Sequence, residues 1–179
     1  MRFRMIGDGM LRPSSMEVGS KLYLIASYPR FARELARWTV TGAQDQRQLF
    51  RRMAFNALTS ATDDHERNHA LVAEDTHFHL SPAFDLVPKT SNTRRRFLSL
   101  VIGESGALAI RHNLLSSSLA FQLTREQANE VIDEVQQVVR AQWRIRLAAR
   151  DVPHADIEMI AGCFDPPSFE DPAPERAVL

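Results

Sequence analysis

Residues 62–69 read TDDHERNH and residues 80–85 read LSPAFD, and most of the side chains that could carry chemistry lie in these two stretches. The segment that joins them contains two strand-like runs, residues 70–72 and residues 77–80. Polar residues 74–76 separate these runs, so the pattern predicts a β-hairpin. Because a hairpin returns the chain to its starting point, we expect the second stretch to lie beside the first.

Helical patterns lie on both sides of this region. Apolar residues at helical spacing predict one helix over about residues 29–41 and a second that begins near Asp45, a residue type that favours the N-cap position. Thr124 and Gln127 have the spacing of a capping box. They open the strongest helical pattern of the chain, which continues to about Arg150.

The remaining segments complete an α+β, mainly helical fold with two small β-hairpins. The second hairpin is expected from residues 97–102 and residues 107–110, with two glycines between them. Residues 1–26 show no periodic pattern, and we expect an irregular N-terminal segment. Residues 165–179 contain four prolines and are expected to form a disordered tail. A single domain is therefore predicted over residues 27–164.

The composition limits the classes of function. The 22 basic and 22 acidic side chains cancel, which argues against direct binding to nucleic acid. Cys163 has no second cysteine to pair with, and no run approaches the roughly 20 apolar residues that cross a membrane. We therefore expect a cytoplasmic protein with no membrane partner. Only Lys21 and Lys89 are lysines, so any lysine-dependent chemistry has two candidates.

One interpretation of the first stretch is a zinc site. His65, Glu66 and His69 satisfy the pattern H-E-x-x-H, in which two histidines on one helical face bind zinc and the glutamate activates a bound water. This requires a helix and a third ligand from a later helix. The neighbouring aspartates favour turns, and strand-like residues follow at once. A zinc hydrolase is therefore the less favoured alternative.

The same region also fits phosphoryl transfer. A kinase uses a carboxylate to orient the attacking hydroxyl, an amide oxygen a few residues later for magnesium, and a second carboxylate for the same metal. Asp63, Asn68 and Asp85 supply these groups in that order, and their oxygens suit magnesium better than the histidines do. The pair Asp63–Asp64 alone could simply cap a turn, so this interpretation depends on Asn68 and Asp85.

Three segments carry a resemblance to a known family: residues 50–58 (FRRMAFNAL), 62–68 (TDDHERN) and 80–86 (LSPAFDL). They resemble the C-terminal kinase lobe of HipA-type toxins, which are bacterial serine/threonine kinases of toxin–antitoxin modules. The resemblance covers about residues 27–164. It implies a protein-kinase-like C-lobe, ATP and magnesium as cofactors, a protein substrate, and a HipB-like antitoxin as a possible partner.

The resemblance also implies roles for individual residues. Asp63 matches the catalytic aspartate, and Asn68 and Asp85 match the magnesium ligands. His65 would hold the loop near the nucleotide, Glu66 and Arg67 would lie along the phosphates, and Phe84 would border the nucleotide. The expected nucleotide-binding residues are thus His65, Glu66, Arg67, Asn68, Phe84 and Asp85.

The chain also departs from the family pattern. A complete kinase of this type has an N-lobe with a loop over the phosphates and a lysine that grips them, and the 62 residues before Asp63 show neither feature. Because positioning supplies most of the catalysis in phosphoryl transfer, we expect weak or absent activity from the isolated chain. Two alternatives follow: a split kinase whose N-lobe is a separate polypeptide, or a non-catalytic module that binds the antitoxin.

Overall fold

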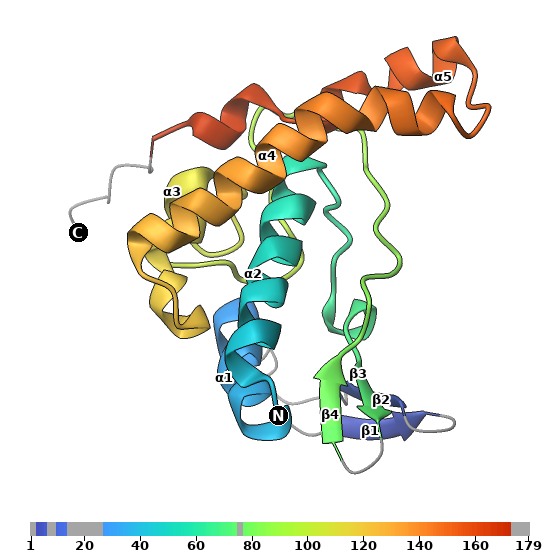
Figure 1. The fold of residues 1–179 in the computed structure, drawn as a ribbon. Helices are drawn as coiled ribbons and strands as arrows, with labels where there is room; N and C mark the ends of the chain where they lie inside the picture. Colours follow the sequence, from blue (N-terminus) through green and yellow to red (C-terminus); the bar gives the residue numbers. More distant parts are fainter. Residues whose placement is uncertain (1–2, 7–9, 14–26, 75–76, 173–179) are drawn as a thin grey trace, which may run out of the picture.

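A computed structural model describes residues 3–6, 10–13, 27–74 and 77–172, and within them the fold is α+β and mainly helical (Figure 1). The helices are α1 (Tyr28–Trp38), α2 (Gly42–Leu58), α3 (Arg111–Ser116), α4 (Arg125–Ala148) and α5 (His154–Met159). The strands are β1 (Phe3–Ile6), β2 (Met10–Pro13), β3 (Leu71–Glu74) and β4 (His77–Leu80). Short 3-10 helices cover Glu66–Asn68, Ser118–Phe121, Ala161–Cys163 and Pro167–Glu170.

The helix starts show which capping predictions hold. The capping box of α4 is confirmed, since Thr124 Oγ1 accepts from Gln127 N at 3.2 Å and Gln127 Oε1 accepts from Thr124 N at 2.9 Å. In contrast, α2 begins at Gly42, and Asp45 lies in its first turn rather than at its N-cap. The Asp45 carboxylate accepts from Thr41 Oγ1 at 3.0 Å and from Leu80 N at 3.3 Å. Asp45 therefore ties α2 to the end of β4.

The predicted hairpin before residues 80–85 is confirmed as the antiparallel pair β3–β4, with Leu71 opposite Leu80. It belongs to a four-stranded sheet of order β1-β2-β3-β4. The expectation of an irregular N-terminus is wrong for β1 and β2, while residues 14–26 lie outside the described ranges. Strands of four residues depend on pairing with a distant partner, here β3, and a local sequence pattern does not show such a contact.

The second predicted hairpin does not form as a strand ladder. The two predicted strands share only the isolated bridges Phe97–Leu108 and Gly103–Gly106, while Val101 forms a parallel bridge with Ser27. The two runs are joined by separate backbone hydrogen bonds, from Leu98 N to Ala107 O and from Ile102 N to Gly106 O, both at 2.9 Å. The buried Asn113 Nδ2 also donates to Gly106 O at 3.0 Å and to Leu108 O at 2.8 Å. The segment is thus a loop with a few backbone cross-links, and Asn113 holds it against α3.

The tail expected to be disordered is packed over its described part, residues 165–172. Phe169 is fully buried and belongs to the main core. The Arg111 guanidinium lies 5.6 Å from the centre of the Phe169 ring, and Arg111 Nε is 2.9 Å from Glu170 Oε2. An aromatic and an acidic residue among the prolines therefore dock this segment onto α3 and α4. Residues 173–179 lie outside the described ranges.

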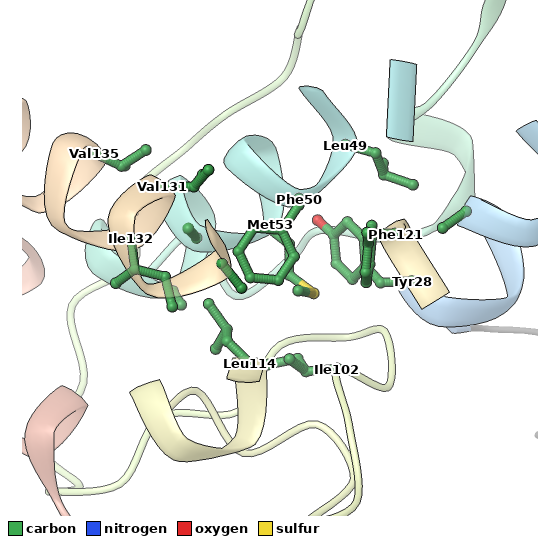
Figure 2. Close-up of a cluster of buried hydrophobic side chains, with 14 of the residues drawn as sticks. Tyr28, Leu49, Phe50, Met53, Ile102, Leu114, Phe121, Val131, Ile132 and Val135 are labelled. Carbon is green, nitrogen blue, oxygen red and sulfur yellow. The ribbon is translucent and has the colours of Figure 1, made fainter. Parts of the chain in front are cut away.

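The core fixes α2 between α1 and α4 (Figure 1). Figure 2 shows side chains from these helices, such as Tyr28, Met53 and Val131, converging in one apolar cluster with Phe50 and Phe121. The rings of Phe50 and Phe121 meet edge to face, with centroids 5.1 Å apart. Because α2 is held on both sides, the residues that follow its last turn start from a rigid support. None of the helices in the described ranges has the length and apolarity that crossing a bilayer requires.

Candidate functional site

Residues 62–69 and 80–85, which we call the two decisive stretches, lie side by side, as expected from the predicted hairpin. The segment with residues 62–69 runs from the end of α2 to the sheet, and the segment with residues 80–85 runs back from β4 next to it (Figure 1). Ser81 N donates to Ala70 O at 2.9 Å, and farther along Lys89 N donates to Ser60 O at 3.0 Å. Backbone hydrogen bonds therefore join the two segments at both ends of the site.

The first segment is anchored at its start by distant parts of the chain. Ser60 has a left-handed backbone (φ 52°), and its Oγ donates to Cys163 O at 2.8 Å. Asp165 N donates to Leu58 O at 2.6 Å, and Ser99 Oγ donates to Thr62 O at 2.9 Å. These contacts hold the backbone on either side of the left-handed turn that leads into Asp63. The sequence gives no local signal for them.

Asn68 connects the residues for which chemistry is predicted. Its side chain is buried, and Nδ2 donates to Asp63 O at 3.3 Å and, over a longer 3.5 Å, to Asp85 O. Asp85 itself is exposed and has a left-handed backbone, with φ 56°. The structure thus brings Asp63, Asn68 and Asp85 together across 22 residues of sequence. Since the amide nitrogen is engaged by carbonyls, the amide oxygen is the Asn68 atom with the chemistry to bind a metal.

Asp63 faces solvent and is surrounded by basic groups. Its side chain is 62% exposed, and Oδ2 lies 2.9 Å from Lys89 Nζ. The hydrogen bond and charge of Lys89, followed by the charges of His65 and Arg67, hold the pKa of the Asp63 carboxyl below its ordinary value. The carboxylate is therefore ionised at neutral pH. Lys89 belongs to this site, although no motif predicted it.

The next residue, Asp64, faces the interior. Its carboxylate accepts from the Tyr28 hydroxyl at Oδ2, and His69 Nε2 lies 3.1 Å from Oδ1. Asn56 Nδ2 donates to the Tyr28 hydroxyl at 3.0 Å. Asp64, His69, Tyr28 and Asn56 are all buried. We call these four residues, together with Arg52, the buried polar network.

Arg52 extends this network to the second segment. Its Nη2 donates to Ser81 O at 2.6 Å, and its Nη1 is 3.2 Å from His69 Nδ1. Burial lowers the pKa of Arg52 to about 10, which still leaves the guanidinium charged at neutral pH. A buried cation therefore links α2, the loop that carries Asp63 and the segment that leads to Asp85.

The zinc interpretation is wrong on geometric grounds. His65 has an extended backbone (φ −112°, ψ 173°) and only Glu66–Asn68 form a short 3-10 helix, so the two histidines do not share a helical face. The two ring nitrogens of His69 already face Arg52 and Asp64. Within the described part of the chain, no cluster of three or more His, Cys, Asp or Glu side chains is arranged to hold a metal ion.

The other expected nucleotide-binding residues lie in differing environments. His65 and Glu66 are half-buried, and Arg67 is exposed. The buried His65 Nδ1 has no hydrogen-bond partner among the described residues. Phe84 is half-buried next to Asp85. Their roles toward a nucleotide stay predictions.

A cavity of about 500 Å³ lies on another side of the second segment, between α2 and α4. It is lined by residues such as Arg52, Phe55, Ser81, Leu86 and Val138. Neither Asp63 nor Asn68 nor Asp85 borders it. We therefore place the candidate site at the exposed junction of the two segments and not in this cavity.

One solved structure with a similar fold is the toxin HipA in the complex of HipA, HipB and operator DNA from a toxin–antitoxin system of Shewanella oneidensis MR-1. The match has a TM-score of 0.62 and 16% sequence identity, and covers 82% of this chain and 36% of that one. The chain thus spans little more than a third of that HipA. At this identity the match shows a shared fold. Comparison with curated proteins gave no match.

The sequence also matches a family model. The model of the HipA-like C-terminal domain matches residues 12–143, which is well over half of the chain. This range includes both decisive stretches, the buried polar network and most of α4. The chain therefore belongs to the family of HipA-like C-terminal domains.

Proposed function

We propose that this chain is the C-terminal lobe of a HipA-like serine/threonine kinase, with ATP and magnesium as cofactors and a protein as substrate. The observation that carries the proposal is the junction at Asn68, whose side chain binds the backbone of both Asp63 and Asp85. The order and spacing of these three residues suit phosphoryl transfer, and family membership supports the same activity.

Each side chain of the junction has a chemical task in this proposal. The Asp63 carboxylate, exposed and ionised, orients the hydroxyl of the substrate and accepts its hydrogen bond. The Asn68 amide oxygen and the Asp85 carboxylate are hard oxygen donors that fit magnesium, which usually takes one or two protein carboxylates and completes its shell with phosphates and water. Bound magnesium would neutralise phosphate charge during the transfer.

The basic surroundings of Asp63 fit a phosphorylated ligand. Lys89, His65 and Arg67 all act on the Asp63 carboxylate, although the chain as a whole has no net charge. Positive side chains beside a metal-binding pair stabilise the charge on transferring phosphoryl oxygens. We propose that Glu66 and Arg67 lie along the phosphates, that His65 holds the loop, and that Phe84 borders the nucleotide.

Full activity would require a phosphate-gripping N-lobe in addition to this junction. We propose that such a lobe acts together with this chain, for example as a separate polypeptide in a split kinase. Because correct positioning of the phosphates accounts for much of the rate of phosphoryl transfer, the chain alone should turn over ATP weakly or not at all.

Metal-dependent nucleotide binding tests the site first. Wild-type protein should bind ATP more tightly with magnesium than without it, and Asp85→Asn should remove that difference. A matched control is Asp151→Asn, because Asp151 is also exposed and also has a left-handed backbone, with φ 58°. Equal ATP affinity with and without magnesium in wild-type protein would contradict the proposed metal site.

Phosphoryl transfer tests the chemistry itself. Labelled ATP and a protein acceptor should give slow transfer with the chain alone and faster transfer once a cognate N-lobe polypeptide is added. Asp63→Asn should abolish both rates while leaving ATP binding in place. Transfer that persists in Asp63→Asn would exclude Asp63 as the group that orients the substrate hydroxyl.

The Shewanella structure holds HipA together with HipB, which supports a HipB-like antitoxin as a partner of this chain. This also favours a second candidate function, a module that binds the antitoxin without catalysis. Growth inhibition on co-expression with a cognate N-lobe polypeptide separates the two candidates. A kinase should lose its effect in Asp63→Ala, whereas a binding module should keep it, and antitoxin capture should survive the substitution in either case.

A further inference from the structure

Lys89 stands out among the residues that no motif predicted. It is one of two lysines among the 22 lysine and arginine residues of the chain. It follows the second decisive stretch by four residues, yet its ammonium lies 2.9 Å from the Asp63 carboxylate in the first. A basic side chain from one segment thus reaches the predicted catalytic group on the other.

The backbone of Lys89 fixes this arrangement. Lys89 N donates to Ser60 O at 3.0 Å, and Ser60 in turn is held by Cys163. Pro88 restricts the chain immediately before Lys89. The side chain is therefore attached to an anchored point of the site and not to a freely moving loop.

Stability does not explain the ion pair. The Lys89 side chain is 50% exposed and the Asp63 side chain 62% exposed, and pairs of this kind contribute little to the free energy of folding. An ammonium has three N–H donors. Asp63 takes one of them, and the described residues supply no other partner for Lys89. Two donors remain directed at solvent, where the oxygens of a ligand could accept them.

We propose that Lys89 is a phosphate-binding residue, whose ammonium contacts the terminal phosphate of magnesium–ATP while it stays paired with Asp63. This inference rests on the proposed kinase function. A phosphate oxygen that shares the Lys89 ammonium with Asp63 would lie next to the group that orients the substrate hydroxyl. Lys89 would thus place the transferred phosphoryl group beside its acceptor.

The test compares nucleotides that differ by the terminal phosphate. Affinities of the full chain for magnesium–ATP and magnesium–ADP are measured for wild type, Lys89→Gln and Lys89→Arg. One lost charge-assisted contact should weaken ATP binding about tenfold, with a smaller effect on ADP. Lys89→Arg should retain most of the affinity for ATP. Arg125→Gln is the control, since Arg125 is an exposed cation at the first position of α4.

The outcomes separate this inference from the proposed function. If Lys89→Gln binds ATP as tightly as wild type while Asp85→Asn loses the magnesium dependence, the inference fails and the kinase site stands. An equal loss of ATP and ADP affinity in Lys89→Gln would also overturn it, because that result indicates a structural role. Wild-type protein that binds neither nucleotide would overturn the proposed function and this inference together.

Discussion

Asp63 and Asp64 are adjacent in sequence and opposite in environment. The Asp63 side chain is 62% exposed and pairs with Lys89, whereas the Asp64 side chain is 2% exposed and contacts Tyr28 and His69. The loop therefore has two faces, one toward solvent where a ligand can bind, and one toward α1 and α2. We infer that Asp63 is the aspartate available for chemistry and that Asp64 supports the loop.

Burial distinguishes the chemical role that we propose for Asp63 from the supporting role of Asp64. A carboxylate removed from water is costly unless hydrogen bonds and opposite charge replace its hydration. Asp64 Oδ2 accepts a hydrogen bond from the Tyr28 hydroxyl, Oδ1 lies 3.1 Å from His69 Nε2, and the Arg52 guanidinium lies behind the histidine. Such a group has little freedom left for a substrate. Asp63, in contrast, keeps an accessible oxygen and a fixed position.

The largest expected effect comes from breaking the inner face. Asp64→Ala removes the buried acceptor of the Tyr28 hydroxyl and the carboxylate beside His69, and it should lower the free energy of unfolding by about 3 kcal/mol. Chemical denaturation with urea measures this value. Asp63→Ala is the matched control and should leave the free energy of unfolding close to that of wild type, because its ion pair is exposed. Equal losses for both substitutions would contradict the division between the two faces.

A smaller loss is expected from the hydroxyl that supports Asp64. Tyr28→Phe keeps the buried ring but removes the donor to Asp64 and the acceptor for Asn56, which should cost about 1–2 kcal/mol. The same urea experiment measures it. In the Asp64→Ala background the additional loss should shrink, because the two groups act on one interaction. Fully additive losses would show that Tyr28 and Asp64 are not coupled.

The smallest change in stability is expected at the outer face, where the effect is on ionisation. Lys89 lowers the pKa of Asp63, so Lys89→Gln should raise that pKa toward the ordinary value of an aspartate. A depressed carboxyl pKa stabilises the fold above the unfolded pKa, and this contribution fades as the pH falls through the folded pKa. NMR titration of the Asp63 carboxyl checks the direction, and an unchanged midpoint would exclude Lys89 as its main partner.

The part of the site set by local sequence was predictable. The β3–β4 hairpin and the spacing of Asp63, Asn68 and Asp85 were visible because strand alternation and turn residues act over a few positions. The capping box of α4 was visible for the same reason. These features were enough to place the two decisive stretches side by side.

The remaining features depend on contacts between distant segments. Nothing near Lys89 indicates that it pairs with Asp63, and nothing near Tyr28 indicates that it supports Asp64. The prediction of a disordered tail is wrong over residues 165–172 for a related reason. The prolines suggested disorder, whereas the burial of Phe169 depends on a surface made by other elements. The second predicted hairpin is reduced to isolated bridges in a loop that Asn113 of α3 holds, and the local sequence pattern does not show that contact.

We propose above all that Asn68 and Asp85 hold a divalent ion beside Asp63. Paramagnetic Mn²⁺ added with ATP tests it most directly, because it broadens NMR signals close to the ion. The signals of the Asn68 side-chain amide and of the Asp85 and Asp63 backbone amides should broaden first, and Asp85→Asn should prevent this at the same Mn²⁺ concentration. If these signals stay sharp, or if the broadening centres on another part of the chain, the proposed ion site is wrong.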